Sequence, residues 1–118
     1  MSRIPPLELR GDDLYVAMCE QGVLVALVQE PWQFTFEIRT LDPALFEWRS
    51  HREIATAIRR LADRGRYPHY RRVRRTLRAE DTIQLLDGLK HIGAAYGNIA
   101  GLIGELQRLR RLRRERKP

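Results

Sequence analysis

Cysteine is nearly absent from this 118-residue chain, in which Cys19 is the only one. A single cysteine excludes a disulfide within the chain. Cys19 lies in an apolar run, which predicts a small buried hydrophobic side chain. A chain without disulfides suits a reducing compartment, and we expect a cytoplasmic protein.

The sequence also lacks a recognisable catalytic or metal-binding motif. It contains no phosphate-binding glycine loop of the P-loop type, no nucleophile elbow and no H-E-x-x-H pattern. His51, His69 and His91 lie too far apart in the chain to form a metal site on one helix or in one knuckle. We therefore expect neither a metal nor another cofactor, and we expect that the protein is not an enzyme.

Long apolar runs are missing as well. Residues 92–104 carry no charge, but these 13 residues are fewer than the ~20 that a membrane-spanning helix needs. Residues 1–13 have no apolar core, so we expect no signal peptide. No membrane partner is predicted.

What the chain does contain is a large and unevenly distributed excess of arginine. The net charge is +7 and the isoelectric point is about 10.5. Residues 1–48 hold 3 Arg and 8 Asp or Glu, a net charge of −5, whereas residues 49–118 hold 19 Lys or Arg and 7 Asp or Glu, a net charge of +12. The length and a hydrophobic content of 43% predict one domain, 1–118. Its basic part favours a polyanion as partner.

The acidic part, residues 1–48, favours strands. Residues 32–39 alternate between apolar and polar side chains, which is typical of a half-buried strand. The apolar face of this strand would hold Trp32, Phe34, Phe36 and Ile38. Residues 23–28 are apolar throughout, like a central strand, and residues 14–19 are a weaker candidate.

These segments predict an α+β fold in which an N-terminal three-stranded antiparallel meander packs on C-terminal helices. The competing interpretation is one buried helix over residues 13–29, because short apolar runs do not distinguish a strand from a helix. That interpretation leads to an all-α fold.

Helix signals dominate the basic part, residues 49–118, and begin just before it. Asp42 followed by Pro43 predicts a capped helix start, and Ser50 with Glu53 has the form of a capping box. Gly65 can end the helix that follows, with a positive φ angle. Acidic residues at 80–81 predict another helix start. We expect a helix over about 81–92, a turn or kink at 93–97, a helix to about 112 and a frayed basic tail within 108–118.

Residues 64–78 form the densest cationic segment, with seven arginines in fifteen residues and no acidic residue. Projected as a helix after Pro68, the segment places Tyr70, Val73 and Leu77 on one side and arginines on the opposite side. Arginine suits phosphate recognition, and an exposed tyrosine can stack on a base. The predicted nucleic-acid-binding residues are Arg64, Arg66, Tyr67, Arg71, Arg72, Arg74, Arg75 and Arg78, with Arg108, Arg110, Arg111, Arg113 and Arg114 as a secondary contact.

A heptad pattern occupies the C-terminal region. Its apolar positions recur at separations of 4 and 3 residues, which is typical of a helix that packs on a partner helix. The stripe consists of Leu85, Leu89, Ile92, Tyr96, Ile99, Ile103 and Leu106. It predicts a protein-binding or homodimer interface, or else the core of this same domain.

Together these features predict a non-catalytic nucleic-acid-binding accessory protein that contacts the backbone of its ligand through arginine clusters, as a small subunit of a larger nucleoprotein assembly. DNA and RNA, single-stranded or double-stranded, all fit these features. The alternative is a protein–protein interaction module, an inhibitor or adaptor whose basic surface occupies an acidic site on a partner protein.

Overall fold

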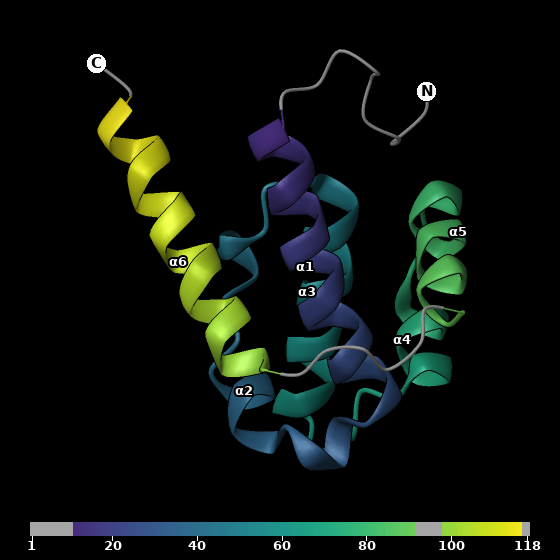
Figure 1. Ribbon diagram of the computed structural model, residues 1–118. Coiled ribbons are helices and arrows are strands. Elements are labelled where there is room, and N and C mark those ends of the chain that lie inside the picture. Colours follow the sequence, from purple (N-terminus) through teal and green to yellow (C-terminus); the bar gives the residue numbers. More distant parts are fainter. Residues whose placement is uncertain (1–10, 92–97, 117–118) are drawn as a thin grey trace.

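The computed structural model describes residues 11–91 and 98–116, and within these ranges it consists of helices and contains no strand. The α-helices are α1 (Gly11–Gln29), α2 (Thr35–Arg39), α3 (Arg49–Asp63), α4 (Tyr70–Thr76), α5 (Glu80–Leu89) and α6 (Ile99–Arg116), and the short 3-10 helices are η1 (Pro31–Gln33) and η2 (Pro43–Leu45). Helices α1 and α3 lie in the middle, with α6 on one side and α4 and α5 on the other (Figure 1). The predicted α+β fold is therefore wrong, and the all-α alternative is confirmed for these residues.

Helix α1 replaces two of the three predicted strands. Residues 23–28 are each at most 2% exposed, because α1 contacts α3, α5 and α6. A segment buried on every side has no polar face, so its sequence shows neither the period of a strand nor that of a surface helix. Residues 20–22, which would connect the first two strands of a meander, continue the helix. Gly22 lies close to α6, since a Cβ atom there would come within 3.0 Å of Leu102 Cδ1.

The alternating segment 32–39 is not a strand either, because it forms η1 and α2. Trp32 and Phe36 are exposed, whereas Ile38 is buried and Phe34 packs against the core. The N–H of Ile38 donates to the carbonyl oxygen of Phe34 at 2.9 Å, as in a helical turn. Every second side chain of this segment is apolar, as in a strand. The two that pack on the core, Phe34 and Ile38, are four residues apart, which is the spacing of one side of a helix.

The expected capping box at the start of α3 is also wrong. The capping box predicts a first helical residue at His51, but the helix begins two residues earlier, at Arg49. The hydroxyl of Ser50 is buried and has no hydrogen-bond partner within the described part of the chain. Glu53 instead accepts a hydrogen bond from Thr82 of α5 at 3.0 Å, so it joins two helices rather than capping its own.

A carboxylate from α1 takes over the role of the cap. Glu20 is fully buried, and it accepts hydrogen bonds from the N–H groups of Glu47 at 2.6 Å and Trp48 at 3.4 Å. Its Oε1 also lies 2.7 Å from Nδ1 of His51. One of the unpaired backbone donors at the start of α3, that of Trp48, and the N–H just before it are thereby satisfied by a residue far away in the chain.

Two other predicted helix boundaries are confirmed. Gly65 has a φ of +73° and follows the end of α3. The N–H of Gly65 donates to Ala62 and that of Arg66 to Leu61, both at 2.9 Å, which is the hydrogen-bond pattern of a Schellman motif. At η2, the side chain of Asp42 accepts a hydrogen bond from a backbone N–H at 3.0 Å and caps the first turn.

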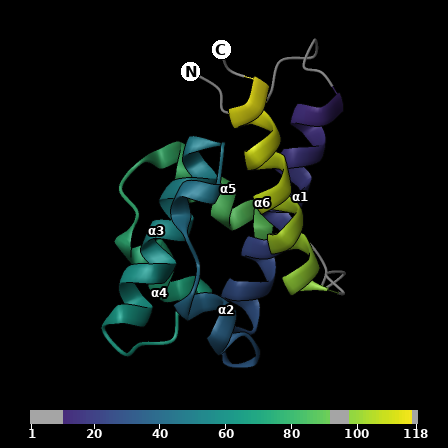
Figure 2. The same ribbon diagram turned by 90° about the vertical axis from the view of Figure 1, so that its left-hand side faces the viewer.

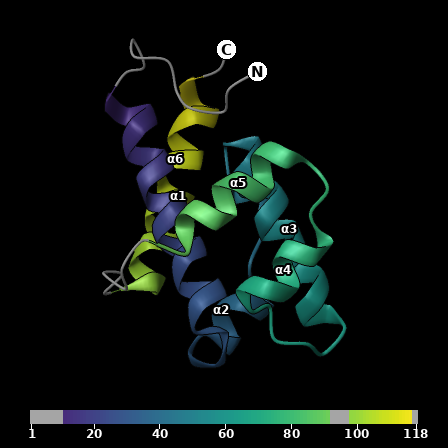
Figure 3. The ribbon, with the colours of Figure 1, turned by 90° about the vertical axis from the view of Figure 1, so that its right-hand side faces the viewer.

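The two flanks of α1 are covered differently. Helix α6 runs antiparallel beside α1 (Figure 2), and α5 crosses α1 on another side (Figure 3). Because α6 remains helical to Arg116, the expected fraying does not occur over residues 108–116. In the described ranges no helix combines the length and the hydropathy required to cross a membrane.

Candidate nucleic-acid interface

Helix α4 docks onto the core by the side that the sequence predicted. Val73 is fully buried, and Tyr70 and Leu77 are partly buried against the core. The helix starts two residues after Pro68, which is itself buried. The exposed arginines of this segment are Arg71, Arg72, Arg74, Arg75 and Arg78.

Arg74 differs from the other arginines because α5 binds it. Its Nε donates to Oδ1 of Asp87 at 3.0 Å, and the hydroxyl of Tyr70 donates to the same oxygen. Arg74 and then Tyr70 lower the pKa of Asp87, since both stabilise the charged carboxylate. The ammonium of Lys90 lies 5.2 Å from the centre of the Tyr70 ring. Arg74 and Tyr70 therefore belong to the contact between α4 and α5.

A cleft of about 710 Å³ separates α3 from the end of α4 and residues 77–79. We call it the α3–α4 cleft. Glu53 is the one acidic residue in its lining. The arginines of the lining are Arg49, Arg52, Arg60 and Arg64 on one wall and Arg75 and Arg78 on the other. Chain segments that are separate in sequence thus place six guanidinium groups around one hollow.

Sequence analysis identified the cleft residues at 64, 75 and 78 but missed those at 49, 52 and 60. A signal for part of the missed wall was present in α3. Positions 49, 53, 56, 60 and 64 are polar or charged and recur at separations of 4, 3, 4 and 4 residues. This spacing puts them on one face of a helix. This face became recognisable as one wall of a basic cleft only when α4 was placed opposite it.

The guanidinium groups of four of the six cleft arginines have no hydrogen-bond or ion-pair partner within the described residues, and they belong to Arg60, Arg64, Arg75 and Arg78. The other two are held by the protein itself. Arg49 lies 3.8 Å from Glu53 and 3.6 Å from Asp81, and Arg52 donates to the carbonyl oxygen of Phe46 at 3.1 Å. Unpaired charges of one sign in a hollow produce a positive potential that attracts anions.

A smaller pocket of about 390 Å³ lies beside the last turn of α3. Its lining includes Arg66, Tyr67 and, from α2, Arg39. We call it the Tyr67 pocket, because the Tyr67 side chain is 54% exposed there. Arg71 and Arg72 are exposed on α4 outside both hollows, and Arg72 donates to the carbonyl oxygen of Tyr67 at 3.4 Å.

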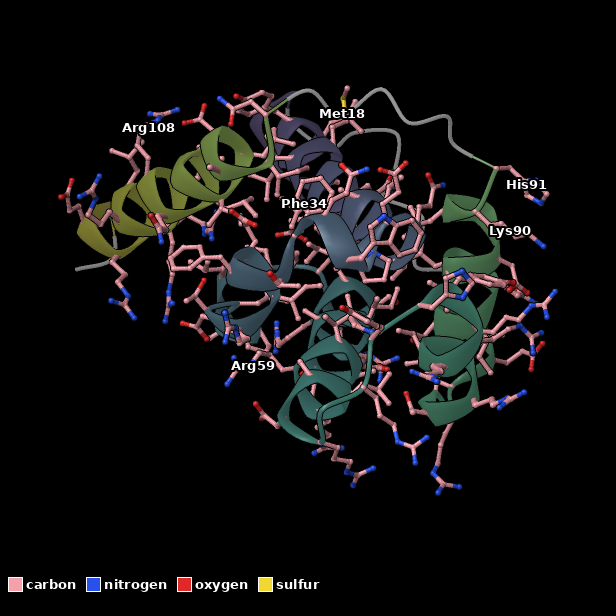
Figure 4. All side chains as sticks on the ribbon, turned by 90° about the horizontal axis from the view of Figure 1, so that it is seen from below. Met18, Phe34, Arg59, Lys90, His91 and Arg108 are labelled. Atoms are coloured by element: carbon pink, nitrogen blue, oxygen red, sulfur yellow. The ribbon has the colours of Figure 1, made fainter. Side chains whose placement is uncertain are left out.

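The C-terminal arginines form a separate surface on α6. Three of them are in ion pairs: Arg108 with Glu105 at 2.5 Å, Arg110 with Asp42 at 3.3 Å, and Arg113 with Glu47 at 2.9 Å. Arg111 and Arg114 have no such partner in the ranges that the structure covers. Arg108 lies far from Lys90 at the end of α5 (Figure 4). Helix α4, which carries most of the first predicted cluster, and α6 lie on opposite sides of α1 and α3 (Figure 1), so the two predicted arginine clusters do not form one continuous surface.

The heptad stripe is divided between α5 and α6. Leu89, Ile99 and Leu106 are buried, and Leu85 and Ile103 are partly buried against the core. The predicted interface residues at 92 and 96 lie outside the described residues. The described part of the stripe thus packs within the protein and presents no single free face.

Comparison with protein families, curated proteins and solved structures finds no match to this chain. Geometry and charge are therefore the grounds for proposing a function. Among the residues that the structure describes, no group of three or more His, Cys, Asp or Glu side chains is arranged to hold a metal ion. The α3–α4 cleft is more strongly charged than the Tyr67 pocket, since six arginines and one glutamate line the cleft and two arginines line the pocket.

Proposed function

We propose that this protein binds nucleic acid without catalysing a reaction, and that the α3–α4 cleft holds the sugar-phosphate backbone. The observation that carries the proposal is the set of four unpaired arginines that face one cleft from both of its walls. Each guanidinium offers five N–H donors in a planar fork that matches phosphate oxygens. A chain of phosphates can neutralise several of them at once, which a single small anion cannot.

The helical positions of these arginines also suit an extended ligand. Arg60 and Arg64 are four residues apart, and so are Arg71 and Arg75 on α4. Side chains at this spacing follow one another along one side of a helix. Arg71 therefore extends the row of Arg75 beyond the cleft, and a strand longer than the cleft can continue along α4. Membership of a larger nucleoprotein assembly remains a prediction from the sequence.

The test compares two double variants with equal changes in charge. The first is Arg64→Gln with Arg78→Gln, one residue from each wall of the cleft. The matched control is Arg111→Gln with Arg114→Gln on α6, which removes two equally exposed and unpaired arginines. Binding to labelled single- and double-stranded DNA and RNA is measured from about 50 to 200 mM salt, where phosphate contacts lose affinity steeply.

We expect the cleft variant to bind more weakly and to reduce the slope of log K against log salt by about 1.4 for a single strand, or about 1.8 for duplex DNA. The control should retain most of the affinity and the slope. Equal losses in the two variants would refute the assignment of the cleft. If the wild-type protein binds none of the four probes at about 50 mM salt, the proposal fails, and an acidic partner protein becomes the ligand to seek.

A further inference from the structure

We infer that the ligand is a single strand of nucleic acid, with its backbone in the α3–α4 cleft and one of its bases stacked on Tyr67. This inference rests on the proposed function and specifies which form of nucleic acid the same site takes. Three features support it: the two hollows adjoin each other, the ring of Tyr67 is presented on a fixed backbone, and the cleft has arginines on both walls.

The two hollows share the last turn of α3. Leu61 and Arg64 line the α3–α4 cleft, whereas Ala62 and Gly65 line the Tyr67 pocket. Neighbouring residues of one turn thus face different hollows, and a chain that leaves the cleft at Arg64 reaches the pocket by crossing that turn. The positive φ of Gly65 directs the backbone out of the helix at this point, toward Tyr67.

The backbone of Tyr67 is held in place while its side chain remains free. Its carbonyl oxygen accepts hydrogen bonds from the N–H of His69 at 2.9 Å and from Arg72 at 3.4 Å, and the next residue, Pro68, is buried. The residue is 54% exposed and lines the pocket together with Arg66. A ring presented in this way can stack on a planar base at a small cost in conformational entropy, because few bonds remain to be ordered.

The other tyrosine of the segment is not available for stacking. The hydroxyl of Tyr70 donates to Asp87, and Lys90 lies over its ring. Of the two tyrosines in this segment, Tyr67 is therefore the one whose side chain has no partner among the described residues. Arg66 and Arg39 in the same pocket add positive charge near the phosphate that would accompany the stacked base.

A single strand fits this arrangement better than a duplex does. The bases of a duplex are stacked and paired, so one of them would have to be flipped out before it could lie on Tyr67. A single strand exposes its bases without that cost. A cleft with arginines on both walls also encloses one backbone, whereas a duplex requires the protein to enter a groove or to span two backbones. An acidic peptide could use the arginines but carries no nucleobase to stack in the Tyr67 pocket.

The test uses Tyr67→Ala and Tyr67→Phe, with Phe36→Ala as a matched control, because Phe36 is an exposed aromatic residue that lines neither hollow. Three probes of equal length are used: an oligothymidine strand, a strand in which most thymines are replaced by abasic residues, and a duplex. We expect Tyr67→Ala to weaken binding of oligothymidine by about 5- to 150-fold, the contribution of one stacked base. Tyr67→Phe and Phe36→Ala should bind like wild type, because Phe keeps the aromatic face.

The abasic strand separates stacking from a general loss of structure. It has the same phosphates, so Tyr67→Ala should bind it as the wild type does. The inference is overturned if Tyr67→Ala binds oligothymidine like wild type, if it weakens all three probes equally, or if the wild type prefers the duplex. The Arg64→Gln/Arg78→Gln variant keeps these failures distinct from a failure of the proposed function, because the cleft assignment stands as long as that variant loses affinity.

Discussion

Removal of the Glu20 carboxylate should destabilise the protein more than removal of any surface charge. Glu20 has no exposed surface, and it satisfies the N–H groups of Glu47 and Trp48 at the start of α3 as well as Nδ1 of His51. Glu20→Ala removes the acceptor of the buried His51 ring and of the two partly buried N–H groups. The contacts of Glu20 with the N–H of Glu47 and with Nδ1 of His51 are short, at 2.6 and 2.7 Å. The contact with the N–H of Trp48 is longer, at 3.4 Å.

The magnitude follows from the two short contacts. A hydrogen bond to a charged group contributes about 1.5–3 kcal/mol, so two of them predict a loss of about 3–6 kcal/mol in the free energy of unfolding. Removing one partner of a buried ion pair has a similar cost, about 3–5 kcal/mol, because the other partner stays buried without a counter-charge. Since small domains are stable by only about 5–15 kcal/mol, Glu20→Ala should be close to unfolding. Glu20→Gln keeps the shape and one acceptor oxygen, and we expect it to lose about 1–3 kcal/mol.

The assay is urea unfolding followed by circular dichroism and tryptophan fluorescence, because Trp48 packs beside His51 at a ring-centre distance of 6.4 Å. The control is Glu47→Ala, which removes only the exposed ion pair with Arg113 and should cost less than about 1 kcal/mol. A double-mutant cycle of Glu20→Gln with His51→Ala should show a coupling of at least about 0.5 kcal/mol. A loss below about 1 kcal/mol for Glu20→Ala, or additive effects in the cycle, would refute the argument that this carboxylate caps α3.

Two further predictions concern local conformation and thiol reactivity. Gly65→Ala should lower the free energy of unfolding by about 1 kcal/mol, because an alanine is strained at a φ of +73°. Gly88→Ala should raise it by about 0.5–1 kcal/mol, because Gly88 lies inside α5 with open space at the Cβ position. Thermal unfolding of both variants checks the opposite signs, and shifts in the same direction would contradict this reasoning. Burial raises the pKa of the Cys19 thiol above its usual value, so the folded protein should react slowly with a thiol reagent at pH 8 and the urea-unfolded protein quickly. Equal rates in the two states would show that Cys19 is accessible.

Features that depend on neighbouring residues could be predicted from the sequence. The three apolar residues on one side of α4 were sufficient to orient that helix, because its other side is charged. Gly65 ends α3 as expected, since few other residues adopt a positive φ at low cost. Asp42 caps η2 because its side chain reaches backbone groups two residues ahead. Each of these outcomes is decided within about one turn of chain.

The error in α1 has a different origin. Residues 14–28 are largely apolar, and a central helix and a central strand both require such a run. Whether such a run becomes a strand or a helix depends on its neighbours in space, which can be strands that pair with it or helices that pack around it. Here α3, α5 and α6 surround α1, and no strand is described that could pair with it.

The sequence alone determined the excess of arginine, its concentration after residue 48 and the orientation of α4, because composition and helical period are local properties. Tertiary structure decided which of these charges remain free. Arg110 and Arg113 pair with Asp42 and Glu47, which are distant in sequence, whereas Arg60 has no acidic partner among the described residues. Ion pairs depend on distances of a few ångströms in space, and spacing along the chain does not contain them. The α3–α4 cleft exists for the same reason, since its two walls meet only after the chain has folded.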